Sequence, residues 1–82
     1  MQLEILTPNE KVFSGEAKLV KAPGSNGSFE ILTNHAALIS TLIEGELKVI
    51  TESDETLRYR ISGGVAEVNN NHVVVLAESL VK

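Results

Sequence analysis

Short runs of alternating apolar and polar residues recur along the chain, and this period of two is typical of half-buried β-strands. The alternation predicts strands in the ranges 2–5, 16–19, 46–49, 56–62 and 73–77. In the second of these, Ala17 and Leu19 are expected to share one face. In the last, the intervening residues Val74 and Leu76 are apolar as well. A strand that is apolar on both faces is expected in the middle of a sheet.

Turn-forming residues separate these runs. They occur at 8–9, 23–27, 44–45, 52–54 and 69–71. The run Asn69-Asn70-Asn71 suits a hairpin, because Asn tolerates the left-handed backbone region better than most residues. The pair Gly63-Gly64 favours a bulge or a close approach of two backbones. Turns about every eight to twelve residues indicate a β-sandwich or a barrel.

The range 31–43 is ambiguous. Its apolar positions fit a helix if every third or fourth residue is buried, and a strand if alternate residues are buried. Because the surrounding sequence is rich in strand patterns, we expect a strand here.

Length and composition narrow the function further. A chain of 82 residues and 8.8 kDa is expected to form one domain, 1–82. Its net charge of −4 argues against binding to DNA or RNA. The absence of cysteine excludes disulfides, thiolate metal sites and thiol catalysis. No apolar run approaches the ~18 residues that span a bilayer, and the start resembles no secretory signal. We therefore expect a soluble protein with no direct membrane insertion.

Candidate catalytic chemistry is sparse. His35 and His72 lack a serine in a nucleophile-elbow motif, so nothing supports a catalytic triad. The sequence that follows Gly63-Gly64 is predicted to be a strand and carries no nearby lysine, which argues against a phosphate loop. The acidic stretch 44–55 lacks the spacing of a calcium loop. We expect no catalytic residue, cofactor or metal, and these features describe a small acidic β-domain that binds other molecules.

Six stretches, in order along the chain, resemble the N-terminal domain of the epsilon subunit of F-type ATP synthases. They are LEILTP (3–8), VFSGEA (12–17), APGSNGSFEIL (22–32), HAALI (35–39), ISGGVAEV (61–68) and NHVVVLAE (71–78). Each stretch alone is weakly specific, whereas six in family order across the whole chain form a specific match. The resemblance implies an all-β fold, a flattened β-sandwich of about ten short strands.

The resemblance also implies a role without chemistry. The family's epsilon subunit belongs to the rotor, or central stalk, and couples the gamma subunit to the c ring so that proton translocation drives ATP synthesis. The expected partners are therefore the gamma subunit and the c ring. The expected location is peripheral, on the cytoplasmic face of a bacterial plasma membrane or the stromal face of a thylakoid, through the ATP synthase complex.

Two groups of contact residues carry over from the family. Those implied to face the gamma subunit are Thr7, His35 and Ser40. Those implied to form a loop that faces the c ring are Gly24, Ser25, Asn26, Gly27 and Ser28. The family's acidic residue in this loop is replaced by small polar residues, which argues against a strong charge contact. For His35, contact with a partner and a hydrogen bond to its own loop remain alternatives.

Most family members continue into a C-terminal helical hairpin, which begins where this sequence reaches Leu80-Val81-Lys82. We therefore expect no nucleotide binding and no inhibition through an extended hairpin. One alternative is a free-standing β-sandwich carrier of the lipoyl type, which needs a lysine at a hairpin tip; Lys11 and Lys48 do not fit that position. A second alternative is a small hydrolase that depends on His35 and His72.

Overall fold

The computed structural model describes residues 1–81, which form eight strands and no helix. The strands are β1 (Gln2–Leu6), β2 (Lys11–Gly24), β3 (Gly27–Leu32), β4 (Leu38–Leu42), β5 (Gly45–Thr51), β6 (Thr56–Ile61), β7 (Gly64–Asn69) and β8 (His72–Ala77). A search of these residues for a helix long and apolar enough to cross a membrane finds none.

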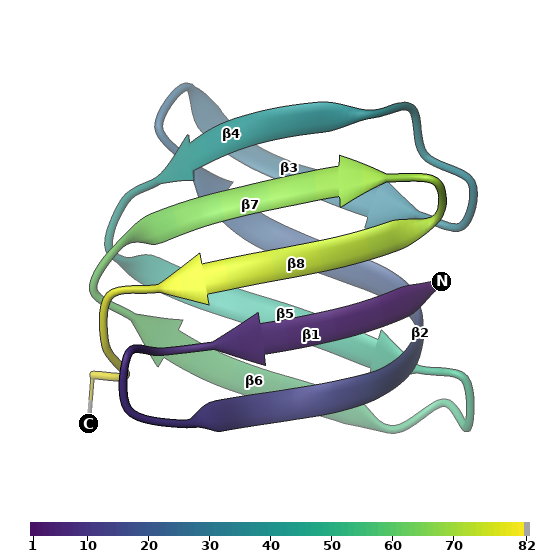
Figure 1. Ribbon diagram of the computed structural model, residues 1–82, viewed down its shortest axis with the longest axis horizontal. Coiled ribbons are helices and arrows are strands. Elements are labelled where there is room, and N and C mark those ends of the chain that lie inside the picture. The colour runs from purple at the N-terminus through teal and green to yellow at the C-terminus, as the bar shows by residue number, and fades with distance from the viewer. Residues whose placement is uncertain (82) are drawn as a thin grey trace.

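The strands form two layers that face each other (Figure 1). Strands β4, β7, β8 and β1 lie side by side in what we call the front layer, and β3, β2, β5 and β6 form the back layer. Strand β2 joins the two: its first part pairs with β1, and its second part pairs with β3 and β5. Because one strand continues from layer to layer, the single sheet folds over on itself as a flattened sandwich.

Strand β2 bends where its pairing changes. The register of the β2–β5 pair shifts between Ala17 and Leu19, which marks a bulge. Ala17 and Val20 are buried, whereas Leu19 is only half-buried. The expectation that Ala17 and Leu19 share a face is therefore wrong, because the extra residue at the bulge turns Leu19 outward.

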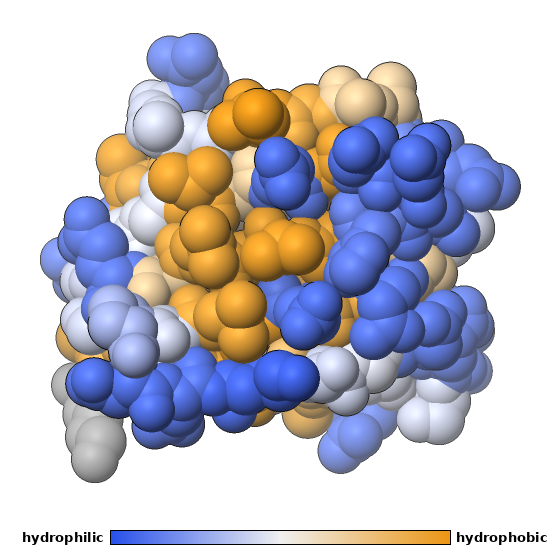
Figure 2. Space-filling view, viewed as in Figure 1, coloured by the Kyte–Doolittle hydropathy of each residue, from blue (hydrophilic) through white to orange (hydrophobic). Residues whose placement is uncertain are grey.

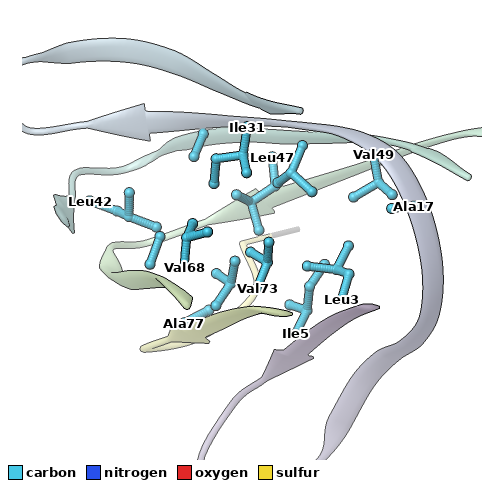
Figure 3. Close-up of a cluster of buried hydrophobic side chains, with 14 of the residues drawn as sticks. Leu3, Ile5, Ala17, Ile31, Leu42, Leu47, Val49, Val68, Val73 and Ala77 are labelled. Carbon is cyan, nitrogen blue, oxygen red and sulfur yellow. The ribbon is translucent and has the colours of Figure 1, made fainter. Parts of the chain in front are cut away.

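The core lies between the layers and consists almost wholly of aliphatic side chains (Figure 3). Leu3 and Ile5 point inward from β1, and Leu47 and Val49 approach from β5; all four are fully buried. Burying a side chain of this size stabilises the fold by about 1.5–3 kcal/mol. The inward positions alternate along each strand, so the core fixes which side chains remain on the two outer surfaces.

The β7–β8 hairpin follows the prediction from the asparagine run. Asn69 pairs with His72, and the two residues between them, Asn70 and Asn71, have φ angles of 51° and 62°. Positive φ at both central residues defines a type I′ turn, which matches the twist of the paired strands.

The expected close approach at Gly63-Gly64 is confirmed. Gly64 has a φ of 154°, and a Cβ atom built on it would lie 2.1 Å from the carbonyl oxygen of Leu76. The residues that follow form strand β7, not a helix, so this segment is not a phosphate loop.

The predicted all-β sandwich is confirmed, with two differences in detail. The described residues form eight strands instead of about ten. The range 31–43 contains no helix, but it is not one strand either: β3 ends at Leu32 and β4 begins at Leu38. Asn34 between them has a φ of 65°, and this left-handed residue reverses the chain. The reversal carries the chain from the back layer to the front.

Candidate partner-binding surface

The outer surface of the front layer carries large apolar side chains that no other part of the described chain covers. Figure 2 shows them as an apolar area over the middle of this layer. We define the apolar patch as Leu6, Ile39, Val65, Val74 and Leu76. Ile39 is 74% exposed and Leu76 is 52% exposed, whereas the other three are partly buried. Exposed leucine and isoleucine side chains gathered on one surface are typical of protein interaction sites.

Strand register brings these residues together from four strands. Leu76 of β8 lies opposite Val65 of β7 on one side and opposite Leu6 of β1 on the other. One pleat away, Ile39 of β4 lies opposite Glu67, and Glu67 lies opposite Val74. Directly opposed side chains on one face of a sheet are about 4.5–5.5 Å apart, so Leu6, Leu76 and Val65 form a continuous row. Ile39 neighbours this row only diagonally, at Val65, because Glu67 lies between Ile39 and Val74.

Polar and charged groups border the patch. The His72 Nε2 atom lies 3.1 Å from Glu4 Oε1, and the Lys11 ammonium lies 3.9 Å from Glu4 Oε2. His72 also lines a hollow of about 440 Å³ with Glu67, Asn69, Asn70 and Val74. An apolar centre with a polar border is the usual composition of a protein interface.

The residues predicted to face the gamma subunit lie at two places on the front layer. His35 and Ser40 line a shallow hollow of about 230 Å³ with Phe29 and Leu38, between the edges of β3 and β4. Thr7 follows the end of β1, and both its backbone N–H and its hydroxyl donate to the carbonyl oxygen of Glu10.

Strand direction places Thr7 and His35 at opposite ends of this layer. Strands β4 and β1 run in the same direction, since both are linked through the antiparallel β4–β7 and β7–β8 pairs and the parallel β1–β8 pair. His35 precedes β4, whereas Thr7 follows β1. The apolar patch therefore lies between the two positions.

His35 makes the local contact that was one of its two expected roles. Its Nδ1 atom lies 2.7 Å from the carbonyl oxygen of Ala36, and its backbone N–H donates to Leu32. The side chain is partly buried and still lines the hollow beside Ser40, so this contact does not remove it from the surface.

The predicted c-ring loop is the tip of the β2–β3 hairpin. Gly24 pairs with Gly27, and Ser25 is bound to β4: its backbone N–H and hydroxyl both donate to the carbonyl oxygen of Thr41. Asn26 and Ser28 remain exposed. The tip lies beside the end of β4, because Gly24 also pairs with Leu42. It is thus at the same end of the sandwich as Thr7.

The described residues offer little for catalysis or carrier chemistry. No three His, Cys, Asp or Glu side chains among them are grouped in a way that could hold a metal ion. Lys48 lies within β5 and Lys11 begins β2, so neither occupies the hairpin tip that a lipoyl-type carrier requires. The geometry therefore gives no support to either alternative function.

Part of the apolar patch was missed from the sequence. Val74 and Leu76 were recognised as apolar residues on the second face of a strand, and Ile39, a side chain that the structure exposes, was assigned to the apolar face of the range 31–43. Leu6 and Val65 were not singled out. Part of the signal was present, since Leu6 and Val65 each adjoin a residue that the structure buries, Ile5 and Ala66, whereas the neighbours of Ile39 are only partly buried. Without the strand order, however, the pattern does not show that they share one surface.

Comparison with known proteins gives the class of the chain. The family model described as ATP synthase, Delta/Epsilon chain, beta-sandwich domain matches residues 1–82. The chain belongs to this family.

Curated relatives point to one member of the family, the epsilon chain. The chain is 39% identical over 82 residues to ATP synthase epsilon chain 1 of Methylococcus capsulatus, and covers 59% of it. It is 47% identical over 76 residues to the epsilon chain of Maridesulfovibrio salexigens, covering 93% of this chain and 53% of that one. It is 37% identical over 78 residues to the epsilon chain of Chlorobaculum tepidum, and the match covers 95% of this chain and 89% of that one. The chain thus spans little more than half of the first two.

Solved structures agree with the fold. A chain in the cryo-EM structure of Euglena gracilis mitochondrial ATP synthase (OSCP/F1/c-ring) superposes with a TM-score of 0.84 at 25% identity, covering 96% of this chain and 51% of that one. A chain in the cryo-EM structure of Tetrahymena thermophila mitochondrial ATP synthase (central stalk/c-ring) superposes with a TM-score of 0.83 at 20% identity, and the match covers 100% of this chain and 66% of that one. The second likeness concerns the fold alone.

Proposed function

We propose that this domain is the docking body of a non-catalytic central-stalk subunit, which couples the gamma subunit to the c ring of an F-type ATP synthase. The observation that carries the proposal is the apolar patch on the front layer of a chain that belongs to the epsilon family. A partner that covers the patch excludes water from Ile39 and Leu76, and burial of apolar area is the main favourable term in association.

The positions of the predicted contact residues agree with one partner on this surface. Thr7 lies at one end of the front layer and His35 at the other, whereas Ser40 lies in the middle of β4, on the face opposite that of Ile39. A gamma subunit seated on the apolar patch between Thr7 and His35 reaches both, and it contacts Ser40 only where it extends over the edge of β4 into the hollow beside His35. The hairpin tip at 24–28 projects from one end of the sandwich and is left free for the polar loops of the c ring.

A sandwich suits this role mechanically. Torque transmission requires a body that keeps its shape while two surfaces are held by partners. Two closely packed layers joined by the continuous strand β2 resist sliding past each other, because a shift would open voids in the core. Held in this way by gamma and the c ring, the subunit is peripheral to the membrane.

Calorimetric titration of the chain into its cognate gamma subunit tests the proposal. We expect a one-to-one complex, and a loss in affinity of about 30- to 700-fold in the double variant Ile39→Ser/Leu76→Ser, since each of the two lost apolar contacts is worth roughly 1–2 kcal/mol. Leu32→Ser is the matched control, because Leu32 is also 52% exposed but belongs to β3 in the back layer. Absence of a complex at tens of micromolar gamma overturns the proposal.

The proposal also includes the expectation that the domain binds no nucleotide. Residues 1–81 form no helix, and the hollows beside Thr7, His72 and His35 contain no lysine, so none of these three combines a helix N-terminus with a lysine as phosphate sites do. A titration with ATP and Mg²⁺ should therefore release no saturable heat, and a saturable curve would contradict this part of the proposal.

A further inference from the structure

The outer surface of the back layer carries a different feature, a row of cationic side chains. Strand register places Lys21 of β2 directly opposite Lys48 of β5, and Lys48 directly opposite Arg58 of β6. The inward neighbours Val20 and Val49 are buried, so all three cations point outward. We call Lys21, Lys48 and Arg58 the basic row.

Such an arrangement is unfavourable for the isolated domain. Like charges that lie directly opposite on neighbouring strands destabilise a sheet. Arg58 is partly neutralised, because its Nη1 atom lies 2.7 Å from Glu46 Oε1. Lys21 and Lys48 have no ion pair within 4 Å among residues 1–81. Two neighbouring lysines thus form no close ion pair, although Glu30 lies opposite Lys21 in the register of β2 and β3.

An apolar row runs beside the basic row. This row lies two residues away from the basic row on each strand. In it, Leu19 of β2 lies opposite Ile50 of β5 on one side and opposite Leu32 of β3 on the other. Leu32 is 52% exposed, and the other two are partly buried. A ligand that crosses β2 and β5 here meets cations and apolar side chains about 7 Å apart, the spacing of alternate residues in a strand.

We propose that the basic row and its apolar neighbours bind an acidic segment of a partner protein. Carboxylates on this segment would compensate Lys21 and Lys48, and its apolar side chains would cover Leu19 and Leu32. Such a segment needs only two or three carboxylates within about 10 Å, since three adjacent strands span roughly that width.

Charge favours a protein segment over a membrane or a nucleic acid. The chain carries a net charge of −4, which repels an extended anionic surface. Glu30 lies opposite Lys21 at one end of the row, and Glu46 lies at the other. These carboxylates limit the basic row to a short site, which fits a few discrete carboxylates better than a continuous sheet of phosphates.

The proposal is independent of gamma docking, because the basic row and the apolar patch lie on opposite outer surfaces of the sandwich. Its test uses a soluble probe, a twelve-residue peptide of alternating Glu and Thr, titrated into the chain and followed by NMR amide shifts. The control peptide has Gln in place of every Glu.

We expect saturable shifts at β2, β5 and β6 with the Glu peptide and none with the Gln peptide. Raising the salt from about 20 to 200 mM should weaken binding several-fold, since screening acts on exposed charges. The variant Lys21→Gln/Lys48→Gln should weaken binding at least about threefold, and Lys21→Arg/Lys48→Arg should retain it. Lys18→Gln is the matched control, because the Lys18 ammonium is already paired with Asp54.

Two results would overturn the proposal. One is the absence of saturable shifts up to millimolar Glu peptide. The other is a chain that does not respond to the peptide but sediments with phosphatidylglycerol vesicles. If the variant Lys21→Gln/Lys48→Gln abolishes this sedimentation, the basic row binds a membrane surface instead.

Discussion

The backbone of Gly64 lies against that of Leu76 so closely that no side chain fits between them. A Cβ atom on Gly64 would stand 2.1 Å from the Leu76 carbonyl oxygen and 3.0 Å from the Ala77 Cα atom. This approach occurs where β7 pairs with β8, the strand that supplies Val74 and Leu76 to the apolar patch. The position of the patch therefore depends on a glycine that takes no part in it.

The substitution Gly64→Ala should destabilise the fold by about 2–4 kcal/mol. Part of the loss comes from the steric overlap with the Leu76 backbone, and part from a φ of 154°, which residues with a Cβ rarely adopt. Urea denaturation measures the free energy of unfolding. Gly27→Ala is the matched control: its φ is 120°, but a Cβ there meets nothing within 4 Å, so only the backbone strain of about 1–2 kcal/mol remains. Equal losses in the two variants would contradict the role of the close approach.

The β7–β8 turn makes a second prediction. Asn70→Ala should cost about 1 kcal/mol, because alanine tolerates a φ of 51° less well than asparagine, whereas Asn70→Gly should be neutral or slightly stabilising. Thermal unfolding followed by circular dichroism compares the two variants. If alanine and glycine shift the midpoint equally, the type I′ geometry is not what stabilises this hairpin.

Replacing a core leucine by alanine should reduce stability, whereas replacing a leucine of the apolar patch should reduce binding to gamma. Leu47→Ala should lower the free energy of unfolding by about 2–5 kcal/mol, since Leu47 is fully buried between the layers. Leu76→Ala should change it by no more than about 0.5 kcal/mol, since half of that side chain is already in water. Binding to gamma, measured by calorimetry, should fall for Leu76→Ala. A large loss of stability in Leu76→Ala would show that its role is structural.

Stability at alkaline pH should depend on Tyr59. Burial, and secondly the charge of Glu55, raises the pKa of the Tyr59 phenol above its ordinary value. Above about pH 10 the unfolded chain therefore loses this proton more readily than the folded chain, and stability falls as the pH rises. In Tyr59→Phe this contribution is absent, so the free energy of unfolding should decline less steeply between about pH 9 and 11.

Part of the loss of stability at alkaline pH should remain in the variant Tyr59→Phe. The hydrogen bond from Lys18 to Asp54, together with the charge of Asp54, also raises the pKa of the Lys18 ammonium, which acts in the same direction. Denaturant titrations at several pH values give the slope of the free energy of unfolding against pH for the wild type and for Tyr59→Phe. Identical slopes in the wild type and Tyr59→Phe would contradict the assignment to Tyr59.

Local patterns in the sequence predicted most of the strands and the sharpest turns, but not β3 or the first part of β2. Alternation is a property of a few neighbouring residues, and the asparagine run and Gly63-Gly64 each act within one turn or one contact. The bend in β2 could not be predicted in this way. It arises because Ala17 pairs with Thr51 while the residues before it pair with β1, a contact between distant segments.

The candidate surface was less predictable than the fold for the same reason. Ile39 and Leu76 lie 37 positions apart in the sequence, and only the order β4-β7-β8 places them on one surface. The resemblance to the epsilon family supplied Thr7, His35 and Ser40 as single positions. It did not indicate the apolar surface that lies between them.

The central claim is that gamma binds the apolar patch, and side-chain footprinting with hydroxyl radicals tests it most directly. Labelling of the free chain and of its complex with gamma gives a protection factor for each exposed side chain. The account predicts that Ile39 and Leu76 become protected several-fold in the complex, while Leu32 on the back layer is labelled equally in both. Unchanged labelling at Ile39 and Leu76, with protection at Leu32, would contradict it.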